Sequence, residues 1–224
     1  MGMQKLKNGK IRISFFILSL FINSLGVVLI TKSALGTSSI STLPFVLSLY
    51  FPLSFGALTF LMNVAFIFLQ YALLGKKGFP PIQWCQFLIN IIFSPAIDFW
   101  MYVFADLVNP SLPLGLLCVV LGSMILAFGI CLEVACQLLL APGEGIVKAI
   151  ATVIGWRLGS TKNAFDASLV VISCLLSNIL GGLGTFTGLG LGTLLSAVLV
   201  GRFVNFFNSR LPFLHKLYTL KDTD

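Results

Sequence analysis

The sequence predicts an all-α, polytopic membrane helix bundle with six transmembrane helices and two short re-entrant or interfacial helices. Only 9% of the 224 residues are charged, whereas about a quarter are charged in a soluble protein. Apolar residues make up 58% of the chain, and Phe and Gly each occur 21 times. The chain therefore has too little polar surface to cover a globule in water, and a bilayer would solvate the excess.

Segment length predicts how often the chain crosses. A spanning helix needs about 20 apolar residues to cross about 30 Å of hydrocarbon. Two further apolar stretches, 38–51 and 144–156, are shorter than this. We expect them to be re-entrant or to lie flat at the interface, and eight spans result if both cross. The six segments of sufficient length are 13–30, 53–74, 82–104, 114–140, 165–183 and 189–207.

The charge distribution predicts the orientation. Six spans place most Lys and Arg residues on one face, which the positive-inside rule makes cytoplasmic. We therefore expect a basic cytoplasmic segment at 1–12, a single membrane domain at 13–207 and a polar cytoplasmic tail at 208–224. No small-residue cleavage pattern follows the first apolar run, so we expect it to stay as a span. The protein is expected in the bacterial inner (plasma) membrane, with both termini cytoplasmic.

The order of elements repeats along the chain. Segments 13–105 and 113–207 each read long helix, Gly or Pro break, short helix, long helix, long helix. An offset of about 103 positions places Gly26 on Gly129 and Asn63 on Asp166. Three crossings per half is an odd number, so the two repeats would be inverted. Inverted repeats with interrupted helices are typical of transporters, in which the breaks supply the binding site near the midplane.

The two breaks contain the candidate solute-binding residues. Glycines there let a ligand approach the backbone, and helix N-termini present free N–H groups. The alternative is a pair of helices lying flat at the interfaces. The candidates are Gly36, Thr37 and Ser38 in the first break, Pro142, Gly143, Glu144 and Gly145 in the second, and Thr193 in the last span.

Five ionisable residues lie within the spans or at their ends: Lys32, Asp98, Glu133, Asp166 and Arg202. A charge at the bilayer centre costs about 2.5–3.5 kcal/mol, so each should face protein or water, and opposite charges should pair. We expect Lys32 and Asp98 in the outer half and the other three in the inner half, with Arg202 near one of the acids. Such groups either lock helices together or act as gates and coupling groups.

The sequence offers no catalytic residues, no metal site and no cofactor-binding motif. All five cysteines lie in apolar segments, and the single histidine, His215, lies in the polar tail. The Gly-rich stretch 181–193 fits no nucleotide-binding pattern. The basic residues form no aromatic-interleaved stripe, so no nucleic-acid partner is expected. We expect the protein not to be an enzyme.

The chain resembles the YczE/YitT group of bacterial membrane proteins, whose function is not assigned. The resemblance covers about 13–207 and depends on Leu35-Gly36-Thr37-Ser38, Ala141-Pro142-Gly143-Glu144-Gly145, Asp98 and Gly190-Leu191-Gly192-Thr193. Ser39 and Glu144 stand where members of the group often have Pro and Asp. The resemblance implies a multi-span fold and no chemistry.

These features favour a small transporter or channel for an unidentified small polar or anionic solute. One alternative is a substrate-binding membrane subunit that docks on an ATPase module. Another is an accessory membrane protein without transport. The expected partners are the lipid bilayer and the solute, and the sequence leaves a homo-oligomer open.

Overall fold

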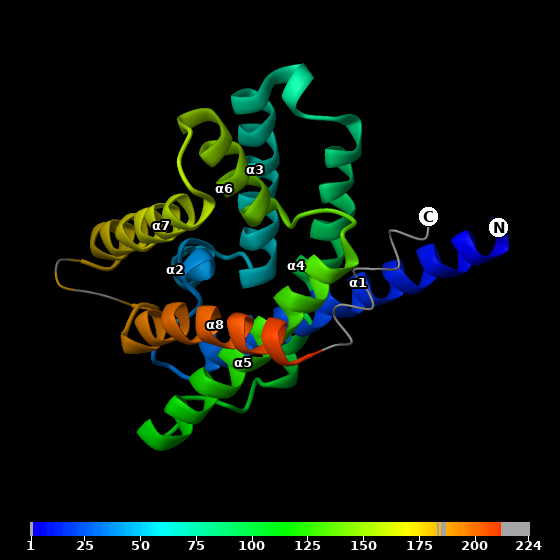
Figure 1. Ribbon diagram of the computed structural model, residues 1–224. Coiled ribbons are helices and arrows are strands. Elements are labelled where there is room, and N and C mark those ends of the chain that lie inside the picture. Colours follow the sequence, from blue (N-terminus) through cyan, green and yellow to red (C-terminus); the bar gives the residue numbers. More distant parts are fainter. Residues whose placement is uncertain (1, 183, 185–186, 212–224) are drawn as a thin grey trace.

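Helices make up the regular structure of this computed structural model, which describes residues 2–182, 184 and 187–211 (Figure 1). Two short 3-10 helices, η1 and η2, accompany eight α-helices. The elements are α1 (Gly2–Lys32), η1 (Ser39–Ser41), α2 (Thr42–Tyr50), α3 (Phe55–Gly78), η2 (Pro81–Cys85), α4 (Gln86–Val103), α5 (Leu112–Cys136), α6 (Pro142–Ile154), α7 (Leu158–Gly181) and α8 (Leu191–Arg210).

The expected six spans are confirmed. Within the described residues, six helical segments are long and apolar enough to cross a membrane: Gly9–Lys32, Phe55–Gly78, Pro81–Val103, Leu112–Cys136, Leu158–Gly181 and Leu191–Arg210. In Figure 1, α1 begins at the right, and α8 runs from the left towards the right and ends near the middle of the view. The beginning of the predicted polar tail, 208–210, is the last turn of α8, and residues 212–224 fall outside the described residues.

Several helix bounds differ from the sequence prediction. The basic segment before residue 13 continues α1 as helix rather than forming a separate segment. α5 ends at Cys136 and not at residue 140, because Gln137 adopts a left-handed conformation (φ 49°) and Pro142 begins α6. α7 begins seven residues earlier than predicted, because Lys162 and Asp166 pair one turn apart and support a polar first part of the helix.

The core of the bundle is the crossing of α1 and α5, the most extensively packed pair of helices. Small residues let the two backbones meet, as is usual in membrane helices. A Cβ atom at Gly26 would lie 2.6 Å from the backbone N of Leu126. A Cβ at Gly122 would lie 2.9 Å from the backbone O of Gly26, and one at Gly129 would meet the side chain of Asn23.

The two short helices start from one shared cluster of apolar side chains. Ile146, near the start of α6, packs against Phe66 and Leu169, which are the midpoints of α3 and α7. Ile40 of η1 packs on the same cluster. From this common depth α6 runs towards the start of α7 and α2 runs towards the start of α3. Both short helices therefore begin at the depth of these two midpoints.

Candidate functional site

The two breaks meet at an apolar junction. The side chain of Ile40, in η1 just after the first break, lies against Gly143 on α6, where any Cβ atom would collide with it. The surrounding cluster comes from α2, α3, α6 and α7, and Phe66 meets Phe165 edge to face at 5.5 Å. The cluster, which we call the central plug, consists of Ile40, Leu43, Met62, Phe66, Ile146, Ile150, Phe165 and Leu169.

On one side of the central plug, two buried glutamines tie α6 to α3 and α4. The side-chain amides of Gln70 and Gln86 donate to each other's oxygens, both at 3.0 Å. The Gln70 amide also donates to the backbone O of Pro142 at 3.1 Å. Gly145 makes this approach feasible, because a Cβ there would lie 2.5 Å from the Gln70 side-chain oxygen. The first turn of α6 is thus hydrogen-bonded to Gln70 of α3, which Gln86 of α4 holds in place.

Charged residues lie on the same side of the central plug. Lys162 Nζ donates to Asp166 at 3.0 Å and forms a salt bridge with Glu144 at 3.7 Å. Glu144 and Lys162 thereby join the first turn of α6 to α7. Lys162 therefore shares its single positive charge between two partly buried carboxylates, Glu144 and Asp166.

Glu133, near the end of α5, is a third acid on this side. It is buried, at 7% exposure, and both carboxylate oxygens accept hydrogen bonds. Asn23 of α1 donates from Nδ2 at 2.8 Å, and the backbone N–H of Ala141 donates at 3.1 Å. Glu133 therefore connects the α1–α5 crossing to the loop that leads into the second break. We call the group Gln70, Gln86, Glu133, Glu144, Lys162 and Asp166 the inner polar cluster.

Hydroxyl groups dominate the opposite side of the central plug. Thr37 shares a 2.6 Å hydrogen bond with Thr31, and its backbone N–H donates to Thr193 Oγ1 at 3.2 Å. Gly36 has φ 128°, and a Cβ there would collide with Thr193 Oγ1. The candidates Gly36, Thr37 and Thr193 are thus brought together. Ser38 caps η1 by position, but its hydroxyl donates to Ser41 Oγ rather than accepting a backbone N–H.

The α2–α7 contact adds further hydroxyls. Ser173 of α7 is fully buried, and its Oγ donates to Thr42 Oγ1 at 3.1 Å. Further along, the Tyr50 hydroxyl lies 3.2 Å from Thr187 Oγ1. These residues and the first break together form a hydroxyl-rich layer on the outer side in the predicted orientation.

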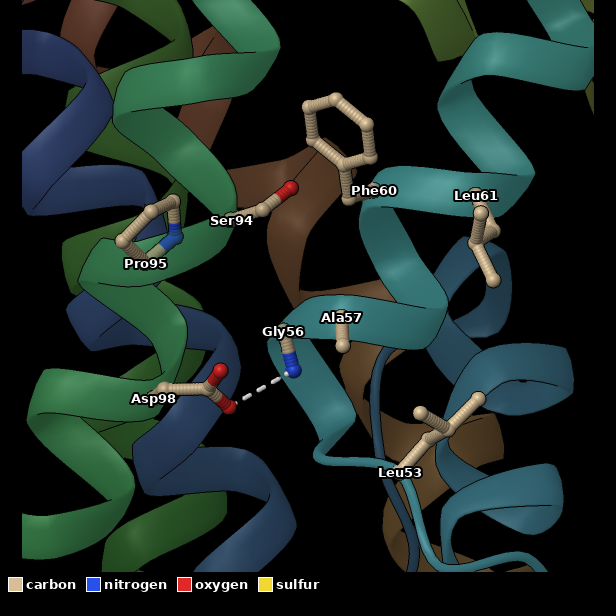
Figure 2. Close-up of a pocket in the computed structure, with 8 residues that line it drawn as sticks. All are labelled: Leu53, Gly56, Ala57, Phe60, Leu61, Ser94, Pro95 and Asp98. Carbon is tan, nitrogen blue, oxygen red and sulfur yellow. Dashed lines mark hydrogen bonds between the residues drawn. The ribbon is translucent and has the colours of Figure 1, made fainter.

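Asp98 binds the first turn of α3 rather than the expected residue of opposite charge. Its carboxylate accepts from the backbone N–H of Gly56 at 2.8 Å and from the Ser54 hydroxyl at 2.6 Å, which satisfies the first turn of α3. Figure 2 shows Asp98 on α4 directed at Gly56 on α3. The groove beside them, of about 510 Å³, is open and lined mainly by apolar side chains, including Leu53, Phe60, Leu61 and Pro95.

The remaining two charges do not pair as expected. Lys32 is partly buried and Arg202 is exposed, and neither forms a salt bridge within the described ranges. Asp166 takes Lys162 as its partner, because residues four apart are neighbours on one helix face. Arg202 has a long side chain that can reach the headgroups, so it needs no buried partner.

Sequence reasoning missed Gln70, Gln86 and Lys162. The first two carried a signal, because an amide inside an apolar span must find a hydrogen-bond partner. Lys162 stands four residues before Asp166, a spacing that favours pairing on a helix, but it lies outside the predicted span 165–183. Among the described residues, no group of three or more His, Cys, Asp and Glu side chains could hold a metal ion.

Comparisons with known proteins place the chain in a family. The chain is 27% identical over 197 residues to an uncharacterized protein of Haemophilus influenzae, covering 87% of this chain and 82% of that protein. No solved structure matches it significantly. The resemblance to the YczE/YitT group stays a prediction. A family model matches residues 10–209, and the chain therefore belongs to this family of unknown function, DUF6198.

Proposed function

We propose that this protein is a small-solute carrier whose transport path runs past the tips of the two re-entrant helices. The observation that carries the proposal is the meeting of Ile40 and Gly143 at the depth of the midpoints of α3 and α7. Interrupted helices that meet at the midplane are the usual way in which secondary transporters build a solute site. Backbone that leaves a helix at this depth is tolerated where it is buried in protein or lines a wet cavity.

An inverted repeat is part of this proposal. α7 repeats α3 at an offset of 103 positions, from Phe55 to Leu158 and from Gly78 to Gly181. The same offset relates members of the central plug to one another, as expected for two halves that meet around a pseudo-two-fold axis. The related pairs within the central plug are Leu43 with Ile146, Met62 with Phe165, and Phe66 with Leu169. The same offset relates Ile40 to Gly143, the residue that it contacts.

Most helix contacts follow the same symmetry, and one pair of helices departs from it. α3 packs on α6 and α7 packs on α2, and α1 packs on α4 just as α5 packs on α8. The exception is that α3 packs along α4, whereas α7 and α8 barely touch. An alternating-access carrier requires its two halves to be arranged differently in any one state. The looser α7–α8 pair is the half that we expect to move.

The central plug acts as the closed gate in this proposal. It separates the hydroxyl-rich layer from the inner polar cluster, so a polar solute would have to displace Ile40 and its neighbours to pass. The inner polar cluster holds Glu133, Glu144 and Asp166 against Lys162, which disfavours a simple anion. We therefore propose a small polar solute that is neutral or cationic.

The proposed orientation places the inner polar cluster towards the cytoplasm. Basic residues cluster where α1 begins, at Lys10 and Arg12, and where α3 ends, at Lys76 and Lys77. The positive-inside rule makes that side cytoplasmic. In a cysteine-free background, cysteines at Lys77 and Gly159 should react with an impermeant thiol reagent only from the cytoplasm, and one at Ser111 only from outside.

Solute movement in proteoliposomes tests the function itself. Purified protein would be screened by exchange of radiolabelled amines, amino acids, amides and small polyols between the lumen and the bath. We expect saturable exchange of one class, and loss of that exchange when Gly145→Leu pushes Gln70 away from α6. Ser111→Leu, at an exposed loop position far from the site, is the matched control.

The closed junction also fits a second candidate, an accessory membrane protein without transport. An apolar plug with no solute path through it would need no motion. A broad panel with no exchange, together with unchanged behaviour of Gly145→Leu in every assay except unfolding, would favour this candidate over a carrier.

A further inference from the structure

We propose that Glu133 is the proton-binding group of this protein and that Asn23 is its positioning residue. The inference deepens the proposed carrier function, on which its coupling part rests, because a proton bound here would drive solute movement. The observations that carry it are the burial of Glu133 and two features of the described residues: none of them gives Glu133 a cationic partner, and a hydrogen-bond acceptor beside it is unused.

Glu133 is buried, and no described residue serves as its counter-ion. It forms no salt bridge among the residues that the structure describes, and its two partners, Asn23 and the Ala141 N–H, are neutral donors. A lone carboxylate in the membrane interior is costly, and such groups either pair or become neutral by taking up a proton. Membrane-embedded acids of this kind commonly serve as proton relays.

Asn23 can serve both protonation states of the acid. Its Nδ2 donates to Glu133 Oε2, but its Oδ1 is buried and has no hydrogen-bond partner among the described residues. This oxygen lies against Gly129, one turn before Glu133 on α5, where only a glycine leaves room for it. A carboxylate accepts from the amide N–H, whereas a carboxylic acid can donate its O–H to the unused amide oxygen.

Each element around Glu133 carries a charged or titratable residue. From α6, Glu144 is a like charge, and from α7, Lys162 is already shared between Glu144 and Asp166. From α1, Arg12 donates to the backbone oxygens of Cys136 and Gln137 at the end of α5, at 2.8–3.2 Å. On α8, Arg202 is exposed, and on α4, Asp98 caps α3. On α5 itself, Cys136 is the nearest other titratable side chain.

The location suits a coupling group. Ala141 immediately precedes Pro142, the first residue of α6, so the Ala141 N–H that binds Glu133 belongs to the entry of the second break. Protonation removes the negative charge that holds this N–H and the Asn23 amide. Uptake of a proton would therefore loosen the link between the α1–α5 crossing and the re-entrant helix α6.

Infrared titration tests proton binding without any knowledge of the solute. The carbonyl stretch of a protonated carboxyl group is distinct from the stretches of a carboxylate, so purified protein is scanned between about pH 5 and pH 9, where only perturbed carboxyl groups change state. We expect a titrating band that is lost in Glu133→Gln and kept in the matched controls Glu144→Gln and Asp166→Asn. Absence of any band that depends on Glu133 would overturn the proposal.

Two further variants distinguish the loss of the titrating carboxyl group from a loss of the fold. Glu133→Asp keeps a carboxyl group and should shift the band rather than remove it. Gly129→Ala should displace the Asn23 amide and also shift the band, because the hydrogen bond to Glu133 changes. A band that is identical in the wild type and in Gly129→Ala would contradict the role of Asn23.

Coupling is then measured in proteoliposomes with a pH-sensitive dye in the lumen and the solutes of the exchange panel in the bath. We expect the wild type to accumulate solute when a pH gradient is applied, and Glu133→Gln to lose this accumulation. Accumulation that persists in this variant, or that follows a sodium gradient at equal pH, would overturn proton coupling. If no solute moves, the carrier function fails, and the infrared result alone decides whether Glu133 binds a proton.

Discussion

The Gln70–Gln86 pair allows a quantitative prediction about the inner polar cluster. Gln70→Leu removes three hydrogen bonds, two to Gln86 and one to the backbone O of Pro142. At about 0.6 kcal/mol for each hydrogen bond between membrane helices, the loss amounts to about 2 kcal/mol. Gln86→Leu should cost a similar amount, because it leaves Gln70 with an unused buried oxygen.

The double variant separates this explanation from a simple loss of packing. Replacing both glutamines by leucine removes both amides together, so no glutamine is left with an unpaired side chain. We therefore expect the double variant to lose about 2 kcal/mol of stability, no more than either single variant. Reversible unfolding in mixed micelles, with helicity followed by circular dichroism, measures all three variants. Additive losses of about 4 kcal/mol in the double variant would refute the hydrogen-bond pair as the source of stability.

Two other predictions follow from the same contacts. Gly26→Val should lower the free energy of unfolding by about 1–3 kcal/mol, because its side chain would collide with the backbone of Leu126, and thermal unfolding in detergent would measure it, with Gly201→Val as the open-space control. Asp98→Ala should cost about 1–2 kcal/mol, because it strips the Gly56 N–H of its acceptor, and loss of amide hydrogen-exchange protection confined to the first turn of α3 would identify the cause, whereas unchanged protection would contradict it.

The sequence predicted the elements of the fold well because apolar length is a direct signal in a membrane protein. It located all six spans, and it expected both short stretches to be re-entrant or interfacial. It erred at α5, where the apolar run continues past Cys136 although the backbone turns at Gln137. Hydropathy carries no information about such a turn, which depends on the loop that connects the end of α5 to Pro142 at the start of α6.

The site was only partly predictable. The Gly and Pro breaks identified both halves of the junction, and the spacing of Gly36 and Thr193 gave no sign that they touch. Charge pairing was predicted by depth alone, which placed Arg202 near Glu133 or Asp166, whereas Asp166 pairs with Lys162 on its own helix. Pairings between neutral side chains, such as Gln70 with Gln86, depend on tertiary packing, and one sequence does not reveal them.

A crosslink between residues 40 and 143 tests the central claim that the two re-entrant helices meet at the transport path. Cysteines replace Ile40 and Gly143 in a cysteine-free background, and a short bifunctional thiol reagent is applied to proteoliposomes that exchange solute. We predict efficient crosslinking and loss of exchange, with exchange restored when a cleavable reagent is reduced. Failure to crosslink, or exchange that continues at full rate through the crosslinked protein, would contradict the account.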